Sequence, residues 1–577
     1  MSFKLPAASR LKNLPYIRGM RIICTSALVA ILLASCQHPP SYDTIIRNGL
    51  IYDGNGGEPF KADIGINADT IAFIGDLHLA KAKNETDARG MPVAPGFINM
   101  LSWANETLIE DGHSQSDIRQ GVTLEVLGEG ESMGPLNSRM KEQMQNGQGD
   151  IKYKINWNSL GQYLHFLETK GISCNVASFV GATTIRNYVI GEDDKAPTPV
   201  QLDSMRLLVR QAMEEGALGV GSSLIYPPAF FAKTAELIAM SEEAGKYGGG
   251  YISHMRSEGN QLLEAVEELV TIAQKAKVHG EIYHLKAAGK DNWYKMDSVI
   301  RRIDRARKEG IDIGANMYTY LAGGTGLTAS MPPALQDGGF GKLCERLKDP
   351  LLRPQIIRDM KTSSGKWENL YYAAGSADRV LLVGFNKDSL KKYTGQSLAA
   401  IAAARGKSPE ETAIDLIVQD SSRISTIYFL MTEDNIKKQI ALPWMSFGSD
   451  EGSYTTAGVF LQSNAHPRAY GNFARVLGRY ARDEKVITLA EAVRKLSKLS
   501  AEKLHIRKRG ELKEGYFADI VIFDPLKVKD NASFEKPHQY AEGMLHVFVN
   551  GAQVLKNGEH TGSTPGRFIK GPGWKMN

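Results

Sequence analysis

Residues Tyr251 to Lys286 read YISHMRSEGNQLLEAVEELVTIAQKAKVHGEIYHLK, a stretch in which two short β-like runs each lead into a histidine. His254 closes the first run and His284 closes the second. Between them, residues Gln261 to Lys277 carry apolar side chains at helical spacing. A strand, a helix and a second strand form a βαβ unit, so we expect the two strands to be parallel neighbours. Both histidines then emerge at the same rim of the sheet, and two converging imidazoles suit a zinc-type ion.

The chain from residue 96 to residue 504 repeats this alternation of short apolar runs and helix-sized segments. Eight of the runs are candidate strands, at residues 96–101, 122–128, 175–181, 218–224, 251–255, 281–286, 313–318 and 445–450. Eight strands separated by helices are typical of a (β/α)8 barrel, an α/β fold of the TIM type. Because there is also a ninth apolar run, 427–431, the number of candidate strands supports a barrel without deciding for it. The Gly- and Pro-rich stretch 322–340 is expected to be a loop or lid over the rim.

Two β-rich segments flank this middle part, at residues 37–95 and 505–577. Their short apolar runs are separated by turns rich in Gly and Asn, such as Asp53-Gly54-Asn55-Gly56-Gly57. We expect the two ends of the chain to form one small β-sandwich beside the barrel. We assign no chemistry to it.

Residues 1–36 are expected to be a signal segment. Met20-Arg21 precedes an apolar run, Ile22 to Leu33, which is shorter than the roughly 20 residues that a spanning helix needs. The ending Leu33-Ala34-Ser35-Cys36 resembles the lipobox of bacterial lipoproteins. We therefore expect lipid on Cys36 and an exported protein anchored to a bacterial membrane, facing the periplasm or the cell exterior. Translation starting at Met20 is an alternative, and so is an ordinary cleaved signal.

Bulk composition excludes several classes of partner. The 577 residues carry a formal charge of +5, which is mild and unclustered, so it does not indicate nucleic acid or an anionic membrane surface. We expect membrane contact only through the lipid at Cys36. Beyond Cys24 and Cys36, only Cys174 and Cys344 remain, and they lie too far apart in sequence to suggest a disulfide framework.

Several short motifs point together to one family. They are VAPGFI (93–98), EGALG (215–219), LIYPP (224–228), SHMRSEG (253–259), HLK (284–286), YTY (318–320), GSD (448–450), HPR (466–468) and RVL (475–477). On these residues the chain resembles the amidohydrolase superfamily, and within it the N-acyl-D-amino-acid deacylases. The resemblance runs from about residue 42 to residue 567. It implies a barrel hydrolase whose metal ion lowers the pKa of a bound water and polarises the scissile carbonyl.

The resemblance also assigns roles to individual residues. His254 and His284 would be metal ligands, and Asp450 would be the general base that takes the proton of water and returns it to the leaving nitrogen. The substrate would be held by residues that offer a positive charge or a phenol hydroxyl to its α-carboxylate. These candidates are Tyr226, Lys286 and Tyr318, with Arg256 as a further one in the motif of His254.

The chain departs from the family after the first strand. The family has Asp-x-His-x-His there, whereas this chain has Leu101 and Trp103 at the two histidine positions, and neither can ligate a metal. Half of a binuclear centre is therefore absent or rebuilt. Ala182 replaces a histidine near the reacting carbonyl, and Asn316 replaces an acidic residue of the seventh strand. Two nearby polar residues are candidates to fill part of the gap, His113 and Arg119.

A second departure concerns the family's Gly-Asn-Cys-Gly, whose cysteine ligates metal. The corresponding stretch here, Leu127 to Pro135, has no cysteine. Counting back from Pro135 places Glu129 at that position, and counting forward from Gly128 places Gly130 there. A carboxylate is a good zinc ligand, so we favour Glu129, with Glu131 as a competitor. With the two histidines it completes a three-ligand set for one zinc per chain, similar to mononuclear members such as N-acetylglucosamine-6-phosphate deacetylases.

Two functions remain open on these grounds. The first is a metal-dependent hydrolase of non-peptide amide C–N bonds that deacylates small N-acyl amino acids, of D configuration by resemblance, or related dipeptide-like or cyclic amides. The second is a catalytically degenerate barrel that binds a ligand or partner, which Leu101, Trp103 and Ala182 favour. A degenerate binder has no need of stoichiometric zinc, so the metal content separates the two functions.

Overall fold

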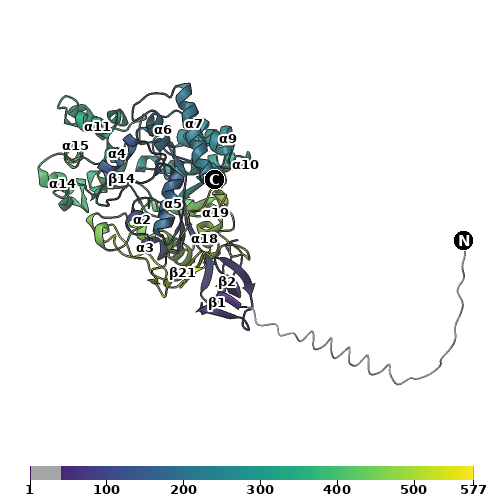
Figure 1. The fold of residues 1–577 in the computed structure, drawn as a ribbon. Helices are drawn as coiled ribbons and strands as arrows, with labels where there is room; N and C mark the ends of the chain where they lie inside the picture. Colours follow the sequence, from purple (N-terminus) through teal and green to yellow (C-terminus); the bar gives the residue numbers. More distant parts are fainter. Residues whose placement is uncertain (2–40, 576–577) are drawn as a thin grey trace, which may run out of the picture.

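The computed structural model describes Met1 and residues 41–575 (Figure 1). The predicted lipidation residue Cys36 and almost all of the predicted signal segment lie outside the described residues. Among the helices of residues 41–575, none has both the length and the apolar character needed to cross a membrane.

The parallel strands of the middle part form two sheets. A three-stranded sheet has the order β6-β7-β8, and a six-stranded sheet has the order β18-β13-β12-β11-β10-β9. The bounds are β6 Phe97–Asn99, β7 Val122–Leu127, β8 Asn175–Ser178, β9 Val180–Gly181, β10 Gly219–Ser223, β11 Gly250–His254, β12 Gly280–Ile282, β13 Ile313–Met317 and β18 Met445–Phe447. Nearly every residue of these strands is buried, because helices cover parallel sheets and leave little strand surface to water.

Backbone hydrogen bonds also join the two parallel sheets. Only Phe179 separates β8 from β9, and its N–H donates to Leu127 O at 2.9 Å. At the other end, Met100 N donates to Phe447 O at 3.1 Å and Asp450 N donates to Leu101 O at 2.9 Å. All eight predicted strands therefore form, the third of them in two pieces. The α/β class is confirmed, and these bonds between the first and last strands fit the predicted barrel.

The predicted helix between the two histidines is also present, as α9 Leu262–Ala276. Its buried residues recur at helical spacing, and it ends at Lys277, whose left-handed backbone stops the helix. The other main helices of the parallel part are α4 Ser138–Gly147, α5 Leu160–Lys170, α6 Ala182–Val189, α7 Pro199–Glu214, α8 Thr234–Gly245, α10 Met296–Lys308, α16 Glu433–Ile440, α17 Arg468–Arg475 and α18 Leu489–Leu496.

Residues 322–431 form an insertion with its own sheet and an apolar cluster that also includes Ala288, Tyr318 and Tyr320 of the parallel part. The sheet is antiparallel, with the order β14-β17-β15-β16. Its strands are β14 Ala322–Gly326, β17 Ser425–Phe429, β15 Val380–Gly384 and β16 Gln396–Ser397, and its main helices are α11 Phe340–Lys348, α12 Arg353–Lys361, α14 Leu398–Arg405 and α15 Pro409–Asp420. The ninth apolar run is thus β17. The predicted loop over 322–340 is wrong for its first five residues, because they pair with β17 as β14.

Strands from both ends of the chain pair in one nine-stranded sheet. They are β1 Ser41–Ile51, β2 Phe60–Asn67, β3 Thr70–Gly75, β4 Lys81–Asp87, β5 Pro92–Pro95, β19 Ile520–Phe523, β20 Met544–Val549, β21 Ala552–Lys556 and β22 Glu559–His560. The ends meet where β5 pairs antiparallel with β19, Ala94 opposite Val521. In Figure 1, β1, β2 and β21 gather away from the insertion. The predicted partnership of the two ends is present as one continuous sheet, in which β5 and β19 are interior neighbours.

Candidate metal centre

Three predicted site residues lie at the carboxyl ends of parallel strands. His254 is the last residue of β11, His284 follows β12 by two residues, and Asp450 follows β18 by three. Because β11 and β12 are parallel neighbours, the two imidazole centroids are 4.5 Å apart, as the βαβ reading predicted. His284 and Asp450 have positive φ angles, 34° and 55°. Such backbone is uncommon outside glycine and is found at sites where the surrounding structure holds functional residues in place.

Glu129 reaches the same place from the loop after β7, between two glycines with positive φ. A Cβ on Gly128 would lie 2.2 Å from Phe179 O, and one on Gly130 would lie 2.6 Å from Ser223 Cβ. The loop can therefore pack closely against β8–β10 only with glycine at both positions. This packing turns Glu129 inward and leaves Glu131 exposed. Of the two registers that the sequence allowed, the structure brings Glu129 to the histidines.

Gly128→Ala is expected to destabilise the chain by about 1–3 kcal/mol, because the new methyl group meets backbone and the φ of +101° is strained for alanine. Thermal unfolding followed by circular dichroism measures the change. Gly341→Ala is the matched control, since Gly341 lies inside α11 with open space where a Cβ would lie, and alanine favours a helix. A Gly128→Ala protein as stable as the parent would show that the loop adapts.

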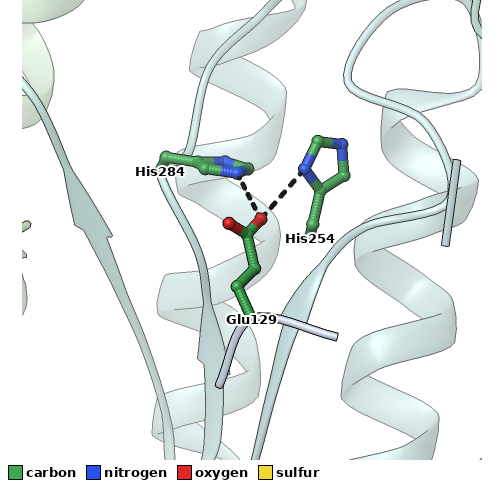
Figure 2. A group of neighbouring side chains, drawn as sticks. All are labelled: Glu129, His254 and His284. Atoms are coloured by element: carbon green, nitrogen blue, oxygen red, sulfur yellow. Dashed lines mark hydrogen bonds and ion pairs between the residues drawn. The ribbon is translucent and has the colours of Figure 1, made fainter. Parts of the chain in front are cut away.

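The three side chains form one buried group (Figure 2). Glu129 Oε1 lies 2.9 Å from His284 Nε2 and 3.2 Å from His254 Nδ1. Only 3–4% of each residue is exposed. Ligand atoms about 2.0 Å from a tetrahedral zinc are about 3.3 Å from each other, so these separations suit a shared cation as well as hydrogen bonds. A carboxylate and two imidazoles are also donors that zinc prefers. The residues present therefore fit a single zinc ion.

A second carboxylate, Glu258, lies behind the histidines. Its Oε1 is 3.0 Å from His284 Nδ1 and accepts a hydrogen bond from Lys286 Nζ at 2.6 Å. Lys286 Nζ also lies 2.8 Å from His284 Nδ1. A carboxylate beside the outer ring nitrogen of a metal-binding histidine orients the ring. Glu258 belongs to the SHMRSEG motif (253–259), and no role was predicted for it. Its signal in the sequence is an acidic residue four positions after a candidate ligand.

Charges within the group keep its carboxylates ionised. Burial by itself raises the pKa of Glu129, but His284 and His254 outweigh burial and hold that pKa below its usual range. Burial and Lys286 lower the pKa of His284, yet Glu258 and Glu129 raise it to about 9. The carboxylates thus stabilise a positive charge among them. A divalent cation held by Glu129, His254 and His284 would supply that charge in place of a proton.

Asp450 is held beside this group by two donors that the sequence argument did not assign. Arg468 Nη1 lies 2.8 Å from its Oδ2, and Arg468 Nη2 donates to its carbonyl at 2.6 Å. Trp103 Nε1 donates to its Oδ1 at 3.1 Å. Burial raises the pKa of Asp450, against the opposing charge of Arg468. A buried carboxylate with a raised pKa is suited to accept a proton during catalysis.

Both predicted phenols border the metal-capable group. The Tyr226 ring centroid is 5.3 Å from that of His254, and the Tyr318 centroid is 6.3 Å from that of His284. The Tyr318 hydroxyl is buried and has no hydrogen-bond partner among residues 41–575. A buried polar group without a partner is costly, so this hydroxyl is available to a ligand. Lys286 also lies here, but its ammonium already contacts Glu258 Oε1 at 2.6 Å and His284 Nδ1 at 2.8 Å.

Arg256 lies elsewhere than the other candidates. Its guanidinium pairs with Glu268 at 2.9 Å and donates to the carbonyls of Phe230 and Ala232. It lines a cavity of about 300 Å³ that none of the Glu129 group enters. The Arg256 guanidinium is therefore engaged by groups of the protein, and its substrate-binding role remains a prediction.

The residues that replace histidines and an acid of the family pattern have different surroundings. Leu101 packs in an apolar cluster, and Ala182 begins α6. Asn316 Oδ1 accepts the backbone N–H of His284 at 2.9 Å, so it positions a candidate ligand. The suggestion that His113 and Arg119 fill the gap is wrong. They contact the C-terminal strands instead, through His560 and Glu559.

Comparison with known proteins gives consistent relatives. The sequence profile of the amidohydrolase family matches residues 84–555. A D-aminoacylase of Alcaligenes xylosoxydans xylosoxydans is 31% identical over 92% of this chain and 97% of its own length.

Among solved structures, the N-acyl-D-glutamate deacylase of Bordetella bronchiseptica, complexed with zinc and a phosphonate that mimics the tetrahedral intermediate, has a TM-score of 0.76 at 28% identity. A D-aminoacylase structure, from work on the role of its binuclear metal centre in which one metal activates and a second attenuates, has a TM-score of 0.75 at 29% identity. Each alignment covers 92% of this chain and 100% of the other.

Proposed function

Because the chain belongs to the amidohydrolase family, we propose that it is a zinc-dependent hydrolase that deacylates small N-acyl-D-amino acids. The observation that carries the proposal is the buried group of Glu129, His254 and His284 with Asp450 beside it. The D configuration and the N-acyl amino acid rest on the relatives, which are named as deacylases of such compounds. A (β/α)8 barrel beside a small β-sandwich is the architecture we propose to carry this site.

Different residues of the chain would bind the metal, transfer the proton and orient a metal ligand during amide hydrolysis. Glu129, His254 and His284 would hold one zinc ion, which when bound lowers the pKa of water and polarises a carbonyl. Asp450 accepts the proton of the attacking water and returns it to the leaving nitrogen. Glu258 Oε1 and Lys286 Nζ both lie beside His284 Nδ1, at 3.0 and 2.8 Å, and would orient the ring so that Nε2 faces Glu129.

Substrate binding is proposed to involve Tyr226, Tyr318 and Lys286. The unpartnered Tyr318 hydroxyl is a donor for the substrate's α-carboxylate. Lys286 would add positive charge while remaining paired with Glu258. We further propose that the protein is exported and anchored by lipid at Cys36, in contact with substrates outside the cytoplasm.

Metal content tests the proposed function directly. Elemental analysis of the purified chain from residue 37 is expected to find about one zinc per chain, lost in His254→Ala because one of three protein ligands is gone. The same preparations are then assayed on matched N-acetyl-D- and N-acetyl-L-amino acids, with turnover expected only for the D series. No zinc, even after it is added back, would contradict the hydrolase and favour a degenerate binding barrel, which the loss of histidine at Leu101, Trp103 and Ala182 also suggests.

A further inference from the structure

Trp103 places its indole N–H between two carboxylates of the site. The Nε1 donates to Glu129 Oε2 at 2.9 Å and to Asp450 Oδ1 at 3.1 Å. The backbone holds the residue there, because Trp103 N donates to Glu451 O at 2.9 Å and the preceding Ser102 N donates to Val126 O at 2.8 Å. The indole therefore spans from the segment after β7 to the segment after β18.

The remaining oxygens of these carboxylates have other partners. Glu129 Oε1 faces the two histidines, and Asp450 Oδ2 faces Arg468. The two oxygens that accept the indole N–H belong to a candidate metal ligand and the candidate general base. Buried carboxylates close together need a cation or donors between them. Trp103 supplies one neutral donor at that place.

A second metal ion is disfavoured at the same place. An indole has an N–H donor and no lone pair for a metal, so Trp103 cannot ligate one. Leu101, at the other position where the family pattern has histidine, is apolar and fully buried. A second cation bound to Glu129 Oε2 and Asp450 Oδ1 would lack the two histidine ligands of the family pattern. It would also have to displace the indole.

We propose that Trp103 is a positioning residue that stands in for a second metal ion. It holds Glu129 and Asp450 together by a shared hydrogen bond, and it excludes a second cation, so that the centre works with one zinc. This inference rests on the proposed zinc-dependent hydrolysis. It assigns a role to a residue whose sequence position suggested a loss of function.

Two substitutions at Trp103 and one matched control test this role. Trp103→Phe keeps a ring and removes the N–H, whereas Trp103→His introduces a possible ligand. Trp444→Phe is the control, because Trp444 Nε1 also donates to a carboxylate, that of Asp304 at 2.8 Å, and Trp444 precedes β18 at the end opposite Asp450. Zinc equivalents, zinc affinity by chelator competition, kcat and KM are measured for each full mature chain. Tryptophan labelled with ¹⁵N in the indole reports the Trp103 N–H by NMR, assigned by its loss in Trp103→Phe.

The expected results separate positioning from mere packing. Trp103→Phe keeps one zinc but binds it about 10- to 100-fold more weakly, the range for losing an outer partner of a metal ligand. Its kcat falls while KM changes less than about twofold, since the substrate contacts remain. Trp103→His binds two zinc ions per chain. The Trp103 indole proton resonates downfield, as expected for a bond to carboxylates, and Trp444→Phe leaves zinc and kcat at parent values.

Other outcomes overturn the inference. They are two zinc ions in the parent, one zinc in Trp103→His, or parent-like zinc affinity and kcat in Trp103→Phe. A parent without zinc contradicts the proposed function instead. An ordinary indole shift for Trp103 overturns the positioning role whatever the zinc content, so the two failures are distinguishable.

Discussion

Asp450→Asn is expected to lower kcat by about 10²- to 10⁴-fold, the usual contribution of a general base, while the chain keeps its zinc. Asparagine has nearly the same shape and can still accept a hydrogen bond from Trp103 or Arg468, but it cannot take a proton from water. Zinc should remain because the contacts that define the metal-capable group involve only Glu129, His254 and His284. Steady-state kinetics on an N-acetyl-D-amino acid, with zinc measured on the same sample, checks both expectations.

The control for this substitution is Asp304→Asn. Asp304 also accepts an indole N–H, from Trp444, but on α10 away from the metal-capable group. Its removal should leave kcat unchanged, which separates proton transfer from the general loss of an indole–carboxylate bond. A kcat within threefold of the parent in Asp450→Asn would show that another group accepts the proton.

Glu129→Ala is expected to abolish activity and weaken zinc binding by more than about 100-fold. Loss of a ligand costs more than loss of an outer partner, which already lowers metal affinity by about 10- to 100-fold. The change also leaves His254 and His284 without the carboxylate that both contact. Chelator competition measures the affinity, and elemental analysis after dialysis measures the retained zinc.

Glu131→Ala is the matched control, two residues along the same loop. Its side chain is exposed, so zinc content and kcat should equal those of the parent. The pair of variants decides between Glu129 and its competitor Glu131 as the metal ligand of this loop. Zinc retained in Glu129→Ala and lost in Glu131→Ala would require the loop to rearrange when metal binds.

Local pattern was enough to predict much of the fold and two of the candidate ligands. The helical spacing between His254 and His284 predicted α9 within one residue at each end. It also placed both histidines at neighbouring strand ends, because a short parallel βαβ connection has few alternatives. The sheet of the insertion was harder to predict, since the Gly-rich run that forms β14 pairs with a single strand, β17, about 100 residues later in the chain.

The sequence by itself therefore determined the order of the strands, the place of the two histidines and the absence of the first-strand ligands. Only the tertiary structure decided that Glu129 rather than Glu131 faces the histidines, because that choice depends on how Gly128 and Gly130 pack against other strands. It alone also placed Trp103 beside Asp450, 347 residues away in the chain. Periodicity is a local property of the backbone, whereas a site formed by loops from several strands depends on contacts between distant segments, which no local pattern contains.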